Sequence, residues 1–270
     1  MLDRKIGLLS LLFAISLVPQ VSAARIQMGV SLVPEDNISS ESFTMDLTIL
    51  NSGDEAAREV TVSLLLPGGF SADDIYAGTM EPGRPFHGTF EVRVPGSVNP
   101  GLYPVVLKTH YTDANAYPFS TVSPSFIKYR SSAPVMTRGR IGNLTLAGQG
   151  EKNLLVEFDN LDEKPHSVLI TVRIPDEIKA REYSKHVSIG AKETGEASFP
   201  LKSFGALPGS IYYVFAQAEY DDGGLHYSSI AQGRVDIVSE EERGLEAPPW
   251  LFAAVLALLI IAAAYMQVRK

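Results

Sequence analysis

The side chains that could do chemistry are few and widely spaced in this sequence. The chain has no cysteine, which rules out a disulfide framework, a thiolate metal site and a cysteine nucleophile. The five histidines are His87, His110, His166, His186 and His226. No two of them stand at a metal-ligand spacing such as H-x-x-x-H. His110 could approach the region of Tyr117 across a hairpin, and His226 could approach Glu219, but neither pair has the third ligand that zinc needs. We therefore predict exposed histidines and no metal centre.

Acidic residues gather in short loops, at Asp73-Asp74, at Asp113 and at Asp221-Asp222. A continuous calcium loop alternates Asp or Asn and contains a Gly, and none of these loops does so. A discontinuous calcium site between loops or at a domain junction stays open. The paired carboxylates of a glycosidase need a cleft that holds them ~5–9 Å apart, which a strand pattern does not supply. No G-x-S-x-G motif and no glycine-rich phosphate loop follows residue 23. We therefore expect a non-enzymatic protein without a cofactor.

Short alternating apolar segments separated by turn residues surround these side chains and predict an all-β protein. In the first half, strands are expected at 25–32, 42–50, 59–66, 88–94, 101–109 and 117–129, with a weaker strand at 75–79. In the second half, strands are expected at 140–146, 153–158, 167–174, 182–189, 193–201, 210–220 and 225–238. A brief helical turn could form at 175–183.

The strand pattern occurs twice. Residues 49–67 read I-L-N-S-G-D-E-A-A-R-E-V-T-V-S-L-L-L-P, which is an apolar strand, a turn, an alternating strand and a closing proline. Residues 158–175 repeat this order as F-D-N-L-D-E-K-P-H-S-V-L-I-T-V-R-I-P, so that Asn160 corresponds to Asn51. The period of about 109 residues is too long for a solenoid repeat and fits one β-sandwich of about seven strands.

The motifs of the first half are, in order, N-S-G-D, V-T-V-S-L-L-L-P, E-P-G-R-P, F-E-V-R-V-P and P-G-L-Y-P-V-V-L. This order resembles the bacterial and archaeal Ig-like β-sandwiches of the CARDB kind and the related NPCBM-associated module of α-galactosidase. The resemblance covers residues 25–238 in two copies, and the second copy lacks the E-P-G-R turn at 190–195. Together with the period, it predicts two tandem Ig-like sandwiches at 24–130 and 131–238. The short segment 130–137 predicts that they stack end to end. The resemblance implies scaffolding, adhesion or accessory binding without catalytic residues.

The N-terminal residues 1–23 have the pattern of a secretory signal peptide. Arg4 and Lys5 precede an apolar run at 6–18, and V-S-A is a small-residue cleavage site that ends at Ala23. We predict cleavage at Ala23, because the run is short for a membrane span and a proline interrupts it. An uncleaved anchor is the alternative.

The C-terminal residues 250–268 predict a transmembrane helix, because 251–268 carry no charge and would span roughly 27 Å. The predicted anchor residues are Trp250, Tyr265, Arg269 and Lys270. The two aromatics stand near the ends of the span, and the terminal basic pair predicts a cytoplasmic tail at 269–270. Residues 239–249 would form a juxtamembrane stalk. A buried helix, or a sorting signal that is cut off, are the alternatives.

The net charge of −8 argues against nucleic acid and anionic lipid head groups as partners. We predict a single-pass cell-membrane protein with its bulk outside the cytoplasm, which contacts an envelope protein partner through loops or a strand edge. A carbohydrate- or cell-wall-binding role is the alternative, through aromatics of the hairpins at 103–129 and 212–227, although most of these are expected in the core.

Glycosylation sequons begin at Asn37 and Asn143 and matter only if the host glycosylates exported asparagines.

Overall fold

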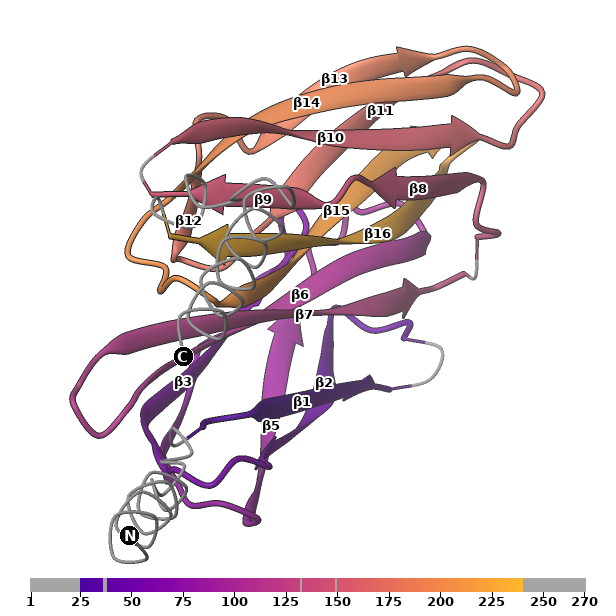
Figure 1. Cartoon of the computed structure of the whole chain (residues 1–270). Helices are drawn as coiled ribbons and strands as arrows, with labels where there is room; N and C mark the ends of the chain where they lie inside the picture. The colour runs from indigo at the N-terminus through magenta and orange to yellow at the C-terminus, as the bar shows by residue number, and fades with distance from the viewer. Residues whose placement is uncertain (1–24, 36–37, 132, 149, 240–270) are drawn as a thin grey trace, which may run out of the picture.

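The computed structural model describes residues 25–35, 38–131, 133–148 and 150–239, which form sixteen strands (Figure 1). None of these residues lies in a helix, so the part of the chain that the structure describes is all-β, as predicted. Within the same ranges, no helix is long and apolar enough to cross a bilayer. The predicted signal peptide, the transmembrane span and its tail, and the stalk beyond Ser239 lie outside the described residues.

The first half of the chain folds into two antiparallel sheets that share one core. One sheet has the order β1-β2-β5, with β1 at Met28–Pro34, β2 at Ser42–Asn51 and β5 at Pro85–Arg93. The other has the order β4-β3-β6-β7, with β4 at Ile75–Met80, β3 at Ala57–Leu65, β6 at Gly101–Thr112 and β7 at Pro118–Tyr129. Alternate residues of β2 point inward, which is the pattern of a strand with one buried face. Met45 and Phe90 of the first sheet thus pack with Val60 and Val105 of the second.

The second half also has two sheets. One has the order β12-β14-β10-β8, with β12 at Ile178–Ala180, β14 at Thr194–Ser203, β10 at Glu151–Asn160 and β8 at Thr137–Ile141. The other runs β13-β11-β15-β16, with β13 at Ser184–Ile189, β11 at His166–Arg173, β15 at Ile211–Asp222 and β16 at Leu225–Val238. A short strand β9, at Leu144–Ala147, adds to β16 in parallel.

The strand order of the first half recurs in the second. The sheet β1-β2-β5 corresponds to β8-β10-β14, and β4-β3-β6-β7 corresponds to β13-β11-β15-β16. The second half adds β12 and β9. The strand expected at 140–146 is therefore two strands, β8 and β9, which belong to different sheets. The region that could have formed a helical turn, 175–183, instead contains β12, because its backbone pairs with the end of β14.

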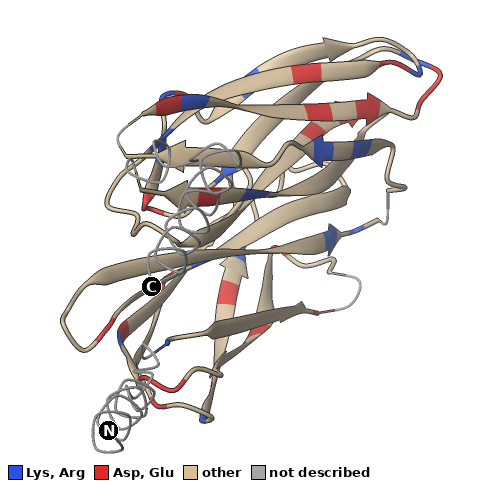
Figure 2. Cartoon of the chain, viewed as in Figure 1, with Lys and Arg blue, Asp and Glu red and all other residues tan. Residues whose placement is uncertain are grey.

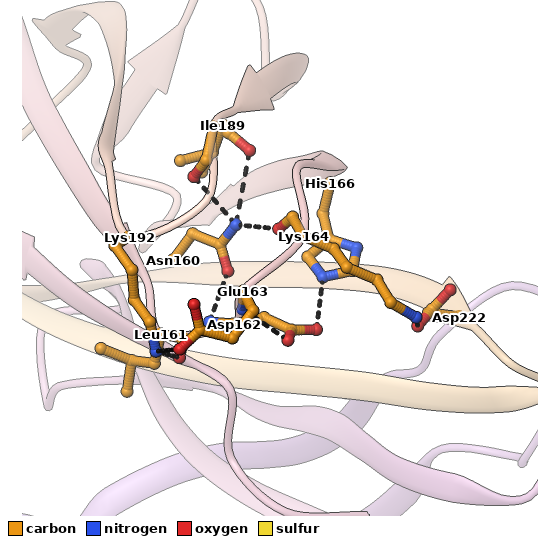
Figure 3. Close-up of polar contacts among 10 residues, drawn as sticks. Asn160, Leu161, Asp162, Glu163, Lys164, His166, Ile189, Lys192 and Asp222 are labelled. Atoms are coloured by element: carbon orange, nitrogen blue, oxygen red, sulfur yellow. Dashed lines mark hydrogen bonds and ion pairs between the residues drawn. The ribbon is translucent and has the colours of Figure 1, made fainter.

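A buried asparagine closes the turn after β10, as Figure 3 shows. The Asn160 side-chain amide donates hydrogen bonds to the carbonyl oxygens of Lys164 at 2.7 Å and Gly190 at 3.0 Å. Its Oδ1 accepts one from the Asp162 backbone N–H at 2.9 Å. The Asp162 carboxylate in turn contacts His166 Nε2 at 2.8 Å. This network satisfies backbone groups that the tight turn would otherwise leave unpaired.

Asn51 forms the equivalent hydrogen bonds at the turn after β2. Its side-chain amide donates to the carbonyl oxygens of Glu55 at 2.7 Å and Met80 at 3.2 Å, and its Oδ1 accepts from the Gly53 N–H at 3.0 Å. Both asparagines are almost fully buried. The sequence correspondence between Asn51 and Asn160 thus reflects one structural device used in each half.

The two halves lie side by side rather than end to end (Figure 1). Each has its own hydrophobic core, and a small third cluster between them contains Val106 of β6, Val122 of β7 and Phe215 of β15. A parallel bridge between Gly101 and His226 joins the two larger sheets into one of nine strands. A Cβ at Gly101 would lie 2.1 Å from the His226 carbonyl oxygen, so this contact requires a glycine.

Candidate binding cleft

A cleft of about 690 Å³ opens where the two halves meet, and we call it the junction cleft. The first half contributes the end of the β6–β7 hairpin, and the second half contributes the β11–β12 and β14–β15 connections. Its lining includes Glu59, His110, Tyr117, Asp176, Lys179 and Phe204. This volume is in the range of small-molecule sites in proteins, ~300–1,000 Å³.

A buried carboxylate fixes the floor of the junction cleft. Glu177 accepts hydrogen bonds from the backbone N–H of Ser120 at 2.6 Å and from its hydroxyl at 2.7 Å. The same hydroxyl accepts a hydrogen bond from the Asp176 N–H at 2.7 Å. Burial, and to a smaller extent the Glu177 charge, raises the pKa of nearby Tyr111 to about 12, so this phenol stays protonated at neutral pH. The two halves are therefore joined here by hydrogen bonds to a buried charge, which are stronger than neutral ones.

Asp176 forms the charged wall of the junction cleft. Its carboxylate makes an ion pair with Lys108, and it lies 3.1 Å from His110 Nδ1 and 3.7 Å from Lys179 Nζ. Partial burial alone would raise the pKa of Asp176, but the Lys108 hydrogen bond and the three neighbouring positive or ionisable groups together lower it. Asp176 is thus an anion with fixed orientation at neutral pH, and it remains partly open to solvent.

Aromatic rings also line the junction cleft. Tyr117 and Phe119 lie with their ring centroids 5.2 Å apart, and both rings are only partly buried. The Tyr117 hydroxyl donates a hydrogen bond to the carbonyl oxygen of Gly205, which ties the β6–β7 hairpin to the β14–β15 loop. Phe204 is 62% exposed, and the Lys179 ammonium lies 5.2 Å from the centre of its ring. The junction cleft thus offers accessible ring faces beside charged groups.

Glu59 reaches the junction cleft from an irregular point of β3. The register of β3 shifts on either side of Val60, and Glu59 has a φ of 51°, in the left-handed region that disfavours non-glycine residues. A residue held in this region costs roughly 1 kcal/mol or more, and such costs occur most often at functional positions. Glu59 lines the junction cleft at this irregular point of the strand.

The junction cleft is suited to holding a ligand. Asp176 and Lys179 form an ion pair, Glu177 is hydrogen-bonded to Ser120, and the Phe204 ring is open to contact. Among the described residues, no group of three His, Cys, Asp or Glu side chains could hold a metal ion. The arrangement can therefore present ring faces, a carboxylate and an ammonium to a polar molecule with apolar surfaces.

The structure brings together both of the histidine pairings that the sequence suggested. His110 and Tyr117 both line the junction cleft. His226 Nε2 lies 3.4 Å from the Glu219 carboxylate, and its ring stacks on Tyr103 with centroids 4.0 Å apart. This second pair lies beside another cleft between the halves, of about 590 Å³.

The prediction that the histidines are exposed is wrong for two of them. His166 and His226 are each less than a tenth exposed. His166 is buried because Asp162 holds it at the turn of Figure 3 and because its ring stacks on Tyr220. His87 is exposed and lies 3.1 Å from the Thr48 hydroxyl, as expected for a strand residue.

Most of the hairpin aromatics are core residues, as expected. The buried tyrosines of the two hairpins are Tyr103, Tyr111, Tyr129, Tyr212 and Tyr220. Tyr117, Phe119 and Tyr213 remain accessible, and the first two line the junction cleft. Sequence reasoning missed Phe204, because it lies in a loop outside the two hairpins. The continuous apolar runs at 103–107 and 211–216, in β6 and β15, could have predicted that these strands are covered on both faces.

Comparison with known proteins supports the resemblance seen in the sequence. Residues 40–112 match the family described as the NPCBM-associated, NEW3 domain of alpha-galactosidase. The match covers β2 to β6 and includes Glu59, His110 and Tyr111 of the junction cleft. No curated protein matches the sequence.

Solved structures give only distant likenesses. A protein of unknown function from Porphyromonas gingivalis is 13% identical, over 77% of this chain and 99% of that one, with a TM-score of 0.30. The alpha-2-macroglobulin of E. coli is 11% identical over 80% of this chain and 17% of that one, with a TM-score of 0.31. A red sea bream transglutaminase is 11% identical over 81% of this chain and 32% of that one, with a TM-score of 0.26. Scores this low carry no functional argument.

Proposed function

We propose that this chain is a non-catalytic, membrane-anchored envelope protein whose junction cleft binds a glycan outside the cytoplasm. The observation that carries the proposal is the placement of accessible rings, Tyr117, Phe119 and Phe204, beside the fixed charges of Asp176 and Lys179. The apolar face of a sugar ring packs on an aromatic ring, while its hydroxyls exchange hydrogen bonds with carboxylates and ammonium groups.

The family match favours this class of ligand. Residues 40–112 match a domain that is described as part of alpha-galactosidase, which suggests an accessory role beside carbohydrate-directed proteins. The junction cleft takes residues from both halves, so a ligand there would depend on the side-by-side packing. The rigid joint between Ser120 and Glu177 would keep the two walls at a fixed distance, which lowers the cost of ordering them on binding.

The membrane location rests on the sequence. The apolar run at 250–268, with Trp250 before it and two basic residues after it, supports a single span with a cytoplasmic C-terminus. The N-terminal pattern ending at Ala23 supports export of the two halves. The anchor would thus set the location of the glycan-binding cleft in the envelope.

A protein partner is the second candidate, and a different observation favours it. Strand β4 stands at the end of the nine-stranded sheet, so one of its edges is open to pairing with another strand. Its Tyr76 is 68% exposed. A partner that added a strand at β4 would use backbone hydrogen bonds together with this ring.

A glycan array probed with the purified full chain in detergent would test the first candidate. We expect Phe204→Ala to weaken binding of the best glycan about tenfold or more, because burying such a ring is worth ~1.5–3 kcal/mol. Tyr76→Ala is the matched control, since it removes a similarly exposed ring that does not line the junction cleft. Unchanged binding by Phe204→Ala would contradict the proposal. Crosslinking in intact cells would test the second candidate. An envelope protein that crosslinks to the parent chain and to Phe204→Ala, but not to Tyr76→Ala, would favour the strand-edge partner.

A further inference from the structure

Two uncharged segments meet at one end of the molecule. No Asp, Glu, Lys or Arg occurs at 114–127 or at 203–218, although a fifth of the chain is charged. Figure 2 shows β7 free of charge along most of its length. The hydrogen bond from the Tyr117 hydroxyl to the Gly205 carbonyl joins the two segments. The two segments therefore bring uncharged residues from both halves together, while Asp113 and Glu55 accept backbone hydrogen bonds at the tip of the hairpin.

Apolar side chains stand exposed within this region. Leu207 is 42% exposed, Ile211 is 51% exposed and Tyr213 is 55% exposed. The three line a groove of about 680 Å³, to which Arg25 and Ile26 also contribute. We call the surface formed by Leu207, Ile211 and Tyr213 the apolar end face. A soluble protein rarely leaves several large apolar side chains together in water without a partner for them.

Both ends of the described chain leave from this place. Arg25, the first described residue, lines the groove itself. At the other end, Ile237 exchanges backbone hydrogen bonds with Gly209 at 2.8 Å and Ser210 at 2.9 Å. The described part of the chain therefore ends at Ser239, beside the loop that carries Leu207.

The distance to the predicted anchor is short. The 11 residues at 239–249 span at most ~40 Å when fully extended, so the membrane lies within that reach of the apolar end face. A tether this short raises the effective concentration of the face at the bilayer, so that a weak contact suffices. The nearest acidic side chain across the strand pair, Asp236, is neutralised by Arg234 at 2.6 Å.

We infer that the apolar end face rests on the lipid surface, with Leu207, Ile211 and Tyr213 in the interfacial layer of a neutral bilayer. This inference rests on the membrane anchor of the proposed function. Tyrosine beside aliphatic side chains is typical of groups that settle at the boundary between head groups and acyl chains. The contact would hold the protein in one orientation and place the junction cleft, whose Phe204 belongs to the same loop, close above the membrane.

Site-specific fluorescence can test this inference, because the chain has no cysteine and a single tryptophan, Trp250. Single cysteines are introduced as Ile211→Cys and, as the control, Tyr76→Cys, and each is labelled with the fluorophore NBD. The full chain is placed in phosphatidylcholine nanodiscs with and without doxyl-labelled phosphatidylcholine as quencher. Both positions are exposed, so neither label disturbs the core.

We expect the label at residue 211 to emit at shorter wavelength and to lose at least half of its intensity with doxyl lipid. The label at residue 76 should behave as it does in water. Quenching of Trp250 reports separately on the anchor. A quenched Trp250 with an unquenched label at 211 would overturn the inference and leave the anchor standing. An unquenched Trp250 would overturn the membrane anchor of the proposed function, whatever the label at 211 shows. If neither Trp250 nor the label at 211 is quenched, both the anchor and the inference are overturned.

Discussion

Removing one hydroxyl at the joint between the halves should weaken the whole protein. Ser120→Ala deletes a hydrogen bond of 2.7 Å to the buried Glu177 carboxylate, and it also deletes the acceptor of the Asp176 N–H. A hydrogen bond to a charged group contributes ~1.5–3 kcal/mol, and the loss of one partner leaves a buried charge less satisfied. With the unpaired amide included, we expect the free energy of unfolding to fall by about 2–4 kcal/mol. Urea denaturation of the full chain in detergent, followed by circular dichroism, measures this change.

The matched control is Ser123→Ala, three residues along the same strand. Ser123 is partly exposed and makes no side-chain hydrogen bond within the part of the chain that the structure describes. Its loss should change the free energy of unfolding by less than ~0.5 kcal/mol. Equal effects of Ser120→Ala and Ser123→Ala would refute the conclusion that a buried hydrogen-bonded carboxylate joins the halves.

Three further predictions concern the turn, the bulge and the charged wall. Asn160→Ala should cost about 2–4 kcal/mol in urea denaturation, because it leaves several turn groups unpaired, and a cost below 1 kcal/mol would count against the network. Glu59→Gly should raise the denaturation midpoint by relieving roughly 1 kcal/mol of strain at positive φ, and a lowered midpoint would contradict this. The lowered pKa of Asp176 stabilises the folded state above the ordinary value of 3.8, and this contribution is lost as the pH falls through the folded-state pKa. The melting temperature of Asp176→Asn should therefore lie below that of the parent chain at pH 7, with a smaller difference at pH 3; a constant difference would contradict the assignment.

The repeated turn shows what the sequence could predict. The matching positions of Asn51 and Asn160 predicted two copies of one strand pattern, and both side chains perform the same hydrogen bonding in the structure. Short alternating apolar segments likewise predicted strands such as that at 42–50, and β2 buries alternate residues in the structure. Turns and strands can be predicted from the sequence because turn residues and strand periodicity act over a few neighbouring positions.

The junction cleft could not be predicted in the same way. Phe204 and Tyr117 lie far apart in the sequence and meet only because the halves pack side by side. The short connecting segment suggested end-to-end stacking, and nothing local contradicted it. The long-range signal in the sequence was the run of consecutive apolar residues at 105–107 in β6, all buried in the structure, because such a run needs cover on both faces of a strand.

Amide hydrogen exchange on the full chain, with and without its best glycan from the array, would test the central claim most directly. The account predicts slower exchange around the tip of the β6–β7 hairpin, residues 110–112 and 117–120, and at 204–205 of the β14–β15 loop when the glycan is bound. Exchange along β4 should stay unchanged. Protection confined to β4, or no protection at the hairpin and loop, would contradict the assignment of the glycan to the junction cleft.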